Sequence, residues 1–373
     1  MNSSISFHDL FGPVNVGFGT AGLGTTHNSF IIEEALKNGF RKFDTAEESD
    51  YWYHQDILGS TLESIFGEAA ENGCDDANTA DEHVCSSSDS LSWSCLEEGL
   101  HISTKIPPWE LTSVKNIRTR AIKSRETLVG FCPDVITAPL DNQSESAFIE
   151  PVPFPMDIYY IHAPRCWDGW HTRCNGIGPN DLLPLREAWK AMEEVLYLDR
   201  SATRIGLSNV HEHELLDIIK FVQRRQNQRR WNSDARNDNG EIEAPPRMPD
   251  VLQSYADPLR PATRLRNICE KHNIEFVAYS TLGTQHGTSP NNNPVLTHPT
   301  ILQLSHKYQK STAEVVLSWA LSKGMSIIPR STKQHHIREL GNLLPKKGTV
   351  GKEGNSMFLE GSDLALIDAM ALD

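Results

Sequence analysis

The sequence predicts an α/β fold in which eight parallel strands close into a (β/α)8 TIM barrel with three surface insertions. Helix-like and strand-like segments alternate along most of the 373 residues, which is typical of a parallel sheet whose strands are connected by helices. Several of the strand candidates end on a polar residue. Because the carboxyl ends of parallel barrel strands meet at one face, such residues can converge on one bound molecule.

Hydrophobic periodicity gives the elements in order. After a short strand at VNVGF, residues 29–40 place their apolar side chains on one helical face, and FRKFD then turns extended. Helical spacing recurs in residues 182–198, 213–222, 262–273 and 312–324, each followed by a strand-like run. The eight strand candidates begin near Val14, Phe40, His101, Asp157, Thr203, Asp250, Ile274 and Met325.

Three stretches interrupt this alternation, and we expect them to be surface insertions in a single barrel that spans residues 1–373. They are an acidic, Ser-rich segment near 68–98, a Pro-rich segment near 131–154 and an Arg-rich segment near 222–249. The Arg-rich segment could bind phosphate or RNA, but nearby Asp and Glu dilute its charge, so a solvated loop is the preferred interpretation.

The charge distribution disfavours several classes of protein. The formal net charge is −14, and nucleic acid or anionic membrane surfaces require clustered Lys and Arg. The N-terminus lacks the basic and apolar regions of a signal peptide, and no apolar run is long enough to span a bilayer. We therefore expect a cytoplasmic enzyme that acts on a small molecule.

The seven cysteines form no C-x-x-C pair, so reduced thiols are expected. No metal site is expected either. The spacings within Cys74, Cys85 and Cys95 match no common zinc pattern, and His211 and His213 are two apart, so on a helix they face different directions.

The glycines Gly17, Gly19 and Gly22 form a G-x-G-x-x-G motif after a strand, and Asp44 ends the next strand. This matches a dinucleotide-binding fingerprint. In a doubly wound fold, however, the helix should begin within the glycine turn, whereas TTHNS intervenes here. We therefore rank a doubly wound dehydrogenase below the barrel, in which the glycines allow a tight loop that can approach a ligand.

Three strand-end residues suggest hydride-transfer chemistry. Asp44, Lys105 and His162 end FRKFD, HISTK and MDIYYIH. An ammonium near a tyrosine would lower the pKa of the phenol from about 10 toward the working range. Such a phenol can protonate a carbonyl oxygen that a histidine orients, while a nicotinamide cofactor supplies the hydride.

With these segments the chain resembles the aldo-keto reductases, a family of NADPH-linked barrels that use an Asp, Tyr, Lys, His tetrad. The matching segments are GFRKFDTA, ISTKI, MDIYYIHAP, RIGLSN, VAYSTLG and TAEVVLSWALSKGMSIIPRST, in the family's order over roughly residues 14–345. The resemblance implies reduction of an aldehyde or ketone to an alcohol, or the reverse reaction, with NADP(H).

The same resemblance implies a cofactor site. Thr20 would lie under the nicotinamide ribose, Tyr279 would stack on the nicotinamide, and Arg330 would bind the 2′-phosphate, which favours NADP(H) over NAD(H). The implied cofactor residues are Gly19, Thr20, Asp44, Ser208, Asn209, Gln253, Tyr279, Ser280, Leu282, Arg330, Ser331, Thr332 and His336.

The sequence departs from the family pattern at the acid. The family usually has its Tyr five residues after the Asp, where this chain has Ser49, so Tyr53 is the preferred acid and Tyr51 the alternative. A non-catalytic NADP(H)-binding redox sensor or regulatory subunit remains the competing function. Trp167 and Trp170 follow His162 and are expected either to line a pocket for an apolar or aromatic carbonyl or to fix their own loop.

Overall fold

The computed structural model of the chain covers most of the predicted barrel. It describes residues 16–24, 28–48, 52–72, 99–130, 154–178, 180–231, 243–287, 292–344 and 358–372. Tyr51, most of the first two predicted insertions (residues 73–98 and 131–153) and part of the third (residues 232–242) lie outside the described residues, whereas residues 222–231 of the third form the end of helix α6 (Glu212–Trp231). The division of the chain into one barrel with three insertions therefore stays a prediction.

Eight parallel strands form one sheet in which each strand pairs with the next along the chain. A parallel bridge between Val16 and Ile327, and a backbone hydrogen bond of 2.9 Å from Gly17 N to Ile327 O, join the first strand to the last. The sheet is thus closed, which confirms the predicted barrel and excludes the doubly wound alternative. The strands are β1 (Phe18–Gly19), β2 (Lys42–Asp44), β3 (His101–Ile106), β4 (Met156–Ile161), β5 (Ala202–Ser208), β6 (Val251–Tyr255), β7 (Glu275–Tyr279) and β8 (Ser326–Ile327).

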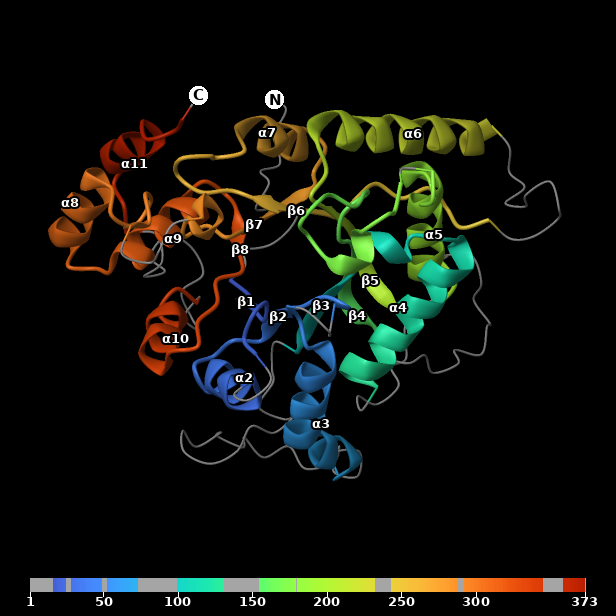
Figure 1. Cartoon of the computed structure of the whole chain (residues 1–373), viewed down its shortest axis with the longest axis horizontal. Helices are drawn as coiled ribbons and strands as arrows, with labels where there is room; N and C mark the ends of the chain where they lie inside the picture. The colour runs from blue at the N-terminus through green and yellow to red at the C-terminus, as the bar shows by residue number, and fades with distance from the viewer. Residues whose placement is uncertain are drawn as a thin grey trace, which may run out of the picture.

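Helices surround the strands in chain order, with α2 and α3 at the bottom of Figure 1, α4 and α5 at the right, and α6 and α7 at the top. The helices that follow successive strands are α2 (Asn28–Lys37), α3 (Gln55–Asn72), α4 (Val114–Val129), α5 (Leu185–Tyr197), α6 (Glu212–Trp231), α7 (Thr263–Lys271), α8 (Pro299–Tyr308), α9 (Thr312–Ser322), α10 (Gln334–Gly341) and α11 (Gly361–Asp368). Short 3-10 turns occur at η2 (Pro108–Glu110), η3 (Thr172–Cys174) and η4 (Thr284–His286).

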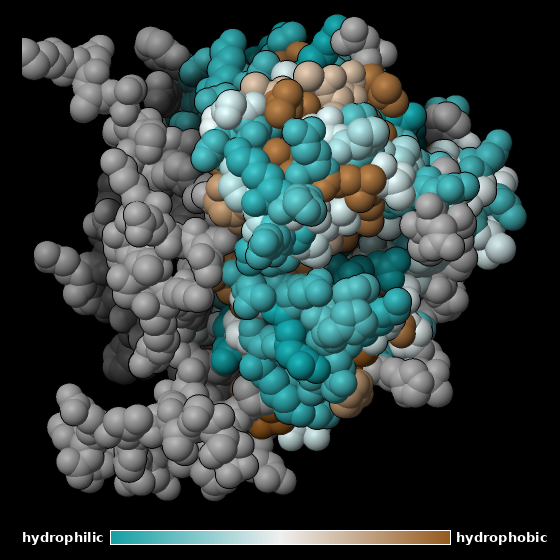
Figure 2. Space-filling model, turned by 90° about the vertical axis from the view of Figure 1, so that its left-hand side faces the viewer, coloured by the Kyte–Doolittle hydropathy of each residue, from teal (hydrophilic) through white to brown (hydrophobic). Residues whose placement is uncertain are grey.

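Helix α9 buries most of its side chains in the core. In α9, Ser311 caps the first turn in a capping box with Glu314, and Trp319 is fully buried at the centre of the helix. Figure 2 shows the opposite character outside, since the face toward α8, α10 and α11 is largely hydrophilic with apolar side chains in small groups. Leu302 in α8 and Leu366 in α11 are among the exposed apolar residues. Within the described part of the chain, no helix combines the length and apolar character needed to cross a bilayer.

Strand register brings the predicted polar residues to the same end of the barrel. Asp44 at the end of β2 is paired with Ser103, two residues before Lys105 in β3. On the other side of the barrel, Ser208 at the end of β5 is paired with Gln253 in β6. Since all strands are parallel, the loops that follow them lie at one face, where the candidate site is found.

Candidate active site

A cavity of about 480 Å³ opens at the carboxyl ends of the strands. Its wall combines carboxylates, a phenol, an imidazole, a guanidinium and several indoles, which is the mixed lining of a small-molecule site. The residues that line it are Gly19, Ala21, Asp44, Glu48, Trp52, Tyr53, His162, Trp167, Gly169, Trp170, Asn209, Gln253, Tyr279, Ser280, Thr281, Leu282, Thr284, Gln285, Leu317, Ile328, Pro329 and Arg330.

A buried ion pair lies at the base of this cavity. Nζ of Lys105 is 2.5 Å from Oδ2 of Asp44, and the two side chains are 0% and 6% exposed. The ammonium also donates to the carbonyl of Thr45 at 2.7 Å. Asp44 accepts further hydrogen bonds from Ser103 Oγ at 3.0 Å and Gln253 Nε2 at 2.8 Å. Both charges are therefore compensated and held in fixed positions.

Among the described residues, Tyr53 is a tyrosine of the cavity wall that lies beside this pair. Its backbone N–H donates to the carbonyl of Glu48 at 3.2 Å, which closes the turn between β2 and α3. The Nζ of Lys105 lies 5.4 Å from the centroid of the Tyr53 ring. The ring also contacts His162 edge-on, with centroids 5.7 Å apart. Asp44, Tyr53, Lys105 and His162 thus come together around one end of the cavity.

The electrostatics at Tyr53 differ from the sequence-based expectation. Burial, with Asp44 and Glu48 adding to it, raises the pKa of the phenol well above 10. Lys105 does not lower it into the working range, because its charge is already satisfied by Asp44 and the Thr45 carbonyl. Tyr53 consequently keeps its proton at neutral pH and is a hydrogen-bond and proton donor rather than a phenolate.

His162 directly follows β4, and a second buried carboxylate, Glu48, lies beside it. Nδ1 of His162 lies 2.5 Å from Oε1 of Glu48, and these side chains are 8% and 1% exposed. Both residues line the cavity. On its other side the imidazole meets the edge of Trp170, with ring centroids 5.1 Å apart.

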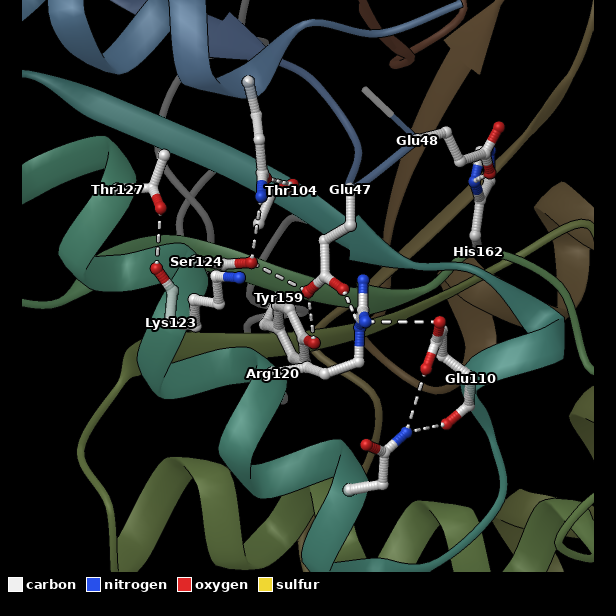
Figure 3. Close-up of polar contacts among 12 residues, drawn as sticks. Glu47, Glu48, Thr104, Glu110, Arg120, Lys123, Ser124, Thr127, Tyr159 and His162 are labelled. Carbon is white, nitrogen blue, oxygen red and sulfur yellow. Dashed lines mark hydrogen bonds and ion pairs between the residues drawn. The ribbon is translucent and has the colours of Figure 1, made fainter. Parts of the chain in front are cut away.

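The side chains of the consecutive residues Glu47 and Glu48 point to opposite sides of the barrel wall. The chain after β2 stays extended, with Glu47 N bonded to Lys105 O at 3.1 Å, and successive side chains of an extended segment point in opposite directions. Figure 3 shows Glu47 turned toward Arg120 and Ser124 of α4 and toward Tyr159 of β4, while Glu48 faces His162. Burial raises the pKa of Glu47, partly offset by Arg120.

The cluster around Glu47 fixes the loop to the outer layer. Its carboxylate accepts from Arg120 at 2.6 Å, Ser124 Oγ at 2.8 Å and Tyr159 Oη at 2.6 Å. Arg120 continues to Glu110, 3.2 Å away. A buried carboxylate with this many donors anchors the backbone of its neighbour Glu48.

The residues expected to hold the nicotinamide end of a cofactor lie together at β5, β6 and β7. Asn209 donates from Nδ2 to the His162 carbonyl at 2.9 Å and accepts from Tyr279 Oη at 2.6 Å. Ser208 is fully buried beside Asn209, whereas Asn209, Gln253 and Tyr279 line the cavity. The φ angles of Asn209 and Ser280 are 53° and 54°, a left-handed conformation uncommon for non-glycine residues and frequent at ligand sites.

The opposite wall is formed by the glycine loop and the loop after β7. A Cβ at Gly19 would lie 2.9 Å from the Ile328 carbonyl, so only glycine fits this approach. Thr20 is buried and donates from Oγ1 to the Asp44 carbonyl at 3.1 Å, which places it behind the cavity wall rather than in it. Ser280 and Leu282, in the loop after β7, also line the cavity.

A basic group stands at the end of β8. Arg330 lines the cavity, and among the described residues no hydrogen bond or carboxylate partner satisfies its guanidinium. Ser331, Thr332 and His336 lie outside the cavity wall, next to it at the start of α10, where Ser331 Oγ is 3.4 Å from Nδ1 of His336. An unsatisfied guanidinium beside a helix start fits an anionic group such as a phosphate.

An aromatic wall completes the cavity after β4. Trp167 stacks on Trp170 with centroids 4.1 Å apart. The loop that carries them is closed by a disulfide between Cys166 and Cys174, whose Cα atoms are 5.3 Å apart. The expectation of reduced thiols was therefore wrong for this pair, because the return of the loop brings together two cysteines that the sequence separates by 8 positions. Cys269 is a buried free thiol.

The sequence interpretation missed several residues of the cavity. Glu48, Trp52 and Gln285 all line it. Trp52 belongs to the lengthened loop before Tyr53, where Gly22 N donates to its carbonyl at 2.6 Å. An alternating pattern after Asp44 could have indicated that one of the two adjacent glutamates points inward, but not which.

Comparison with known proteins supports the barrel and identifies the family. The model of the "Aldo/keto reductase family" matches residues 153–347, just over half of the chain. The NAD(P)H-dependent D-xylose reductase of Candida tenuis is 24% identical over 326 residues, which cover 85% of this chain and 80% of that protein. The structure of the aldose reductase from Giardia lamblia matches with a TM-score of 0.63 and 19% identity, covering 96% of this chain and 92% of that one.

Most of the curated relatives match over a shorter stretch. The 9,11-endoperoxide prostaglandin H2 reductase of Trypanosoma cruzi is 30% identical over 188 residues, which cover 50% of each chain. The NAD(P)H-dependent D-xylose reductase of Pyricularia oryzae is 28% identical over 203 residues, 54% of that protein. The chain thus spans about half the length of these relatives.

Proposed function

Because the chain belongs to the aldo-keto reductase family, we propose that it catalyses the NADPH-dependent reduction of an aldehyde or ketone to an alcohol. The observation that carries this proposal is the convergence of Asp44, Tyr53, Lys105 and His162 at one end of the cavity. The relatives that share this family are named as NAD(P)H-dependent reductases.

In the proposed reaction, Tyr53 donates its phenolic proton to the carbonyl oxygen. Its raised pKa keeps the phenol protonated at neutral pH, so the proton is present when the carbonyl is reduced. The proposal includes the reverse reaction, the oxidation of an alcohol, because a catalyst lowers the barrier in both directions. Asp44 holds Lys105 in place beside the Tyr53 ring, where the ammonium can stabilise negative charge as it develops on the phenol oxygen. His162 orients the carbonyl oxygen by hydrogen bonding, and a reduced nicotinamide would supply the hydride.

The proposed cofactor is NADP(H). Asn209, Gln253 and Tyr279 are placed to hold the nicotinamide end, since their polar groups border the cavity beside His162. Arg330 supports the phosphorylated form, because its guanidinium lacks an acidic partner among the described residues and can bind a phosphate dianion. Ser331, Thr332 and His336 would complete this phosphate site. A cytoplasmic location, where NADP is kept largely in its reduced form, remains part of the proposal.

The proposed substrates are apolar or aromatic carbonyl compounds. Trp167 and Trp170 present stacked indole faces to the cavity, and such faces bind flat apolar groups well. Trp170 also contacts His162, so a ring held against it would place its carbonyl near the proton donors.

This function is tested by the oxidation of NADPH with a panel of aliphatic and aromatic aldehydes. The reaction is monitored through the loss of reduced-nicotinamide absorbance. We expect turnover in the native protein and a loss of about 100-fold or more in kcat for Tyr53→Phe. Tyr308→Phe is the matched control, because the Tyr308 hydroxyl bonds to Asp363 away from the cavity. Tyr51→Phe, at the alternative position, should keep activity.

Cofactor binding is measured in parallel by fluorescence. Native protein that binds NADPH but turns over none of the aldehydes would refute the proposed reaction and favour the non-catalytic NADP(H)-binding function. Full activity in Tyr53→Phe together with inactive Tyr51→Phe would instead move the acid to Tyr51.

A further inference from the structure

Glu48 is a buried carboxylate in the cavity wall that the proposed tetrad does not use. Its side chain is 1% exposed, and its Oε1 lies 2.5 Å from Nδ1 of His162. No lysine or arginine lies within ion-pair distance of it among the described residues. A buried carboxylate is costly unless a partner compensates its charge, and the imidazole of His162 is the partner that the fold supplies.

The two facing atoms depend on one another. Oε1 of Glu48 and Nδ1 of His162 are both buried and lie 2.5 Å apart, and neither makes a hydrogen bond of good geometry with any described group, their own contact included. An unsatisfied buried donor or acceptor is costly, so each gains most by sharing a proton with the other. Because Nδ1 faces Glu48, Nε2 is the ring nitrogen left to form a hydrogen bond with a molecule in the cavity.

The position of Glu48 is fixed from both sides. The neighbouring Glu47 is tied to Arg120, Ser124 and Tyr159 outside the strands, and the Glu48 carbonyl accepts from Tyr53 N. A slip of the loop would therefore move Glu48 and Tyr53 together. The carboxylate, the imidazole and the phenol form one constellation, which Trp170 closes from the other side of His162.

We infer that Glu48 is a positioning residue of the active site, which holds a proton on Nδ1 of His162 so that its Nε2–H group is directed at the carbonyl oxygen of the substrate. This inference rests on the proposed reductase function. Tyr53 transfers the proton in the reaction, and the Glu48–His162 pair provides a second, oriented hydrogen bond to the oxygen as negative charge develops there. Without an acceptor at Nδ1 the ring can rotate and change its tautomer.

The test uses Glu48→Gln and Glu48→Ala in the full chain, with Glu33→Gln as the matched control. Glu33 lies on the outer helix α2, and its side chain is 41% exposed. We expect kcat to fall by about tenfold or more in both Glu48 variants, as for other carboxylates that orient a histidine. NADPH affinity should stay within about twofold of native, because Glu48 acts on the carbonyl and not on the cofactor.

Chemical rescue separates orientation from a purely structural role. Added formate can enter the space left in Glu48→Ala and should restore part of kcat, whereas chloride at the same ionic strength should not. Failure of formate to restore any activity in a folded, NADPH-binding Glu48→Ala protein counts against the inference.

Nitrogen NMR of labelled histidine gives a readout that does not need turnover. The His162 signals are assigned by their loss in His162→Asn, and we expect Glu48→Ala, which removes the acceptor, to shift the Nδ1 signal. Unchanged His162 signals in Glu48→Ala overturn the inference, whether or not kcat falls, because Glu48 would then act without His162. A protein that shows the coupled NMR signals but no carbonyl turnover would refute the proposed reaction while leaving the pair intact.

Discussion

Replacement of Lys105 by methionine probes the buried charge pair at the base of the cavity. Methionine has a similar length but no ammonium, so Asp44 would lose the partner 2.5 Å from its Oδ2. Loss of one member of a buried pair costs about 3–5 kcal/mol. Asp44 keeps the donors Ser103 and Gln253, which places the expected loss near the lower limit, at about 3 kcal/mol.

This loss can be converted into a melting temperature. An unfolding entropy of about 2.1 cal/mol/K per residue, applied to 373 residues, gives a decrease in Tm of about 4 °C. Urea unfolding gives the free energy directly and calorimetry gives Tm. Lys37→Met is the control, because Lys37 is 53% exposed and pairs with Glu33 on the surface, where we expect a change below about 0.5 kcal/mol.

The double variant Asp44→Asn, Lys105→Met completes the test. Removal of both charges leaves no unpaired buried ion, so its cost should fall short of the sum of the two single costs by about 2 kcal/mol. Strict additivity, or a Lys105→Met protein as stable as the Lys37→Met control, would show that the pair is not buried and coupled as described.

Three further outcomes follow from other parts of the site and its surroundings. Arg330→Gln should weaken NADPH binding by about tenfold or more and leave NADH binding nearly unchanged, because only NADPH carries the 2′-phosphate. Both affinities are measured by fluorescence titration, and equal losses for the two cofactors would show that Arg330 does not bind the 2′-phosphate. Trp170→Ala should raise KM for aromatic aldehydes more than for short aliphatic ones, and a uniform change across the panel would argue against a substrate wall. Burial raises the pKa of Glu193 from 4.5 to about 7, so in this pH range the folded state holds a proton that the unfolded state releases. The free energy of unfolding should therefore fall as the pH rises from about 4.5 to 7. In Glu193→Gln, the urea midpoint should lose this part of its dependence on pH.

The strand-end residues were predictable because barrel geometry is periodic. Asp44, Lys105 and His162 each close an apolar run, and parallel strands necessarily bring such ends to one face. The family resemblance then supplied their roles as expectations. The closed sheet and the alternation of helices and strands follow from the same local patterns, since each helix and strand needs only its own apolar face to be recognised.

The loop after β2 could not be predicted in the same way. Glu47 and Glu48 are chemically identical, and the direction of each side chain depends on backbone hydrogen bonds to β3 that the sequence does not specify. The protonation of Tyr53 was also missed, because its pKa depends on burial and on two carboxylates rather than on the nearby lysine alone. The side-chain directions of Glu47 and Glu48 and the pKa of Tyr53 both depend on long-range packing, which local sequence patterns do not report.

The Cys166–Cys174 disulfide is a third case of this kind. Cysteine spacing favoured free thiols, whereas the loop folds back over Trp109, whose ring stacks on His171 at 4.6 Å between centroids. The contact between those two rings is set by the tertiary position of η2 beside η3, and the approach of the two cysteines follows from it.

The anchoring of Glu47 to α4 predicts how unevenly this protein would tolerate random mutation. Arg120 and Ser124 belong to an outer helix, and Arg120 is 28% exposed, yet they fix the segment that carries the inward carboxylate and the phenol. Lys123, on the same helix, makes no side-chain hydrogen bond or ion pair with this cluster among the described residues. Substitutions at Arg120 or Ser124, on the outside of the barrel, should therefore alter the active site, although neither side chain lines the cavity.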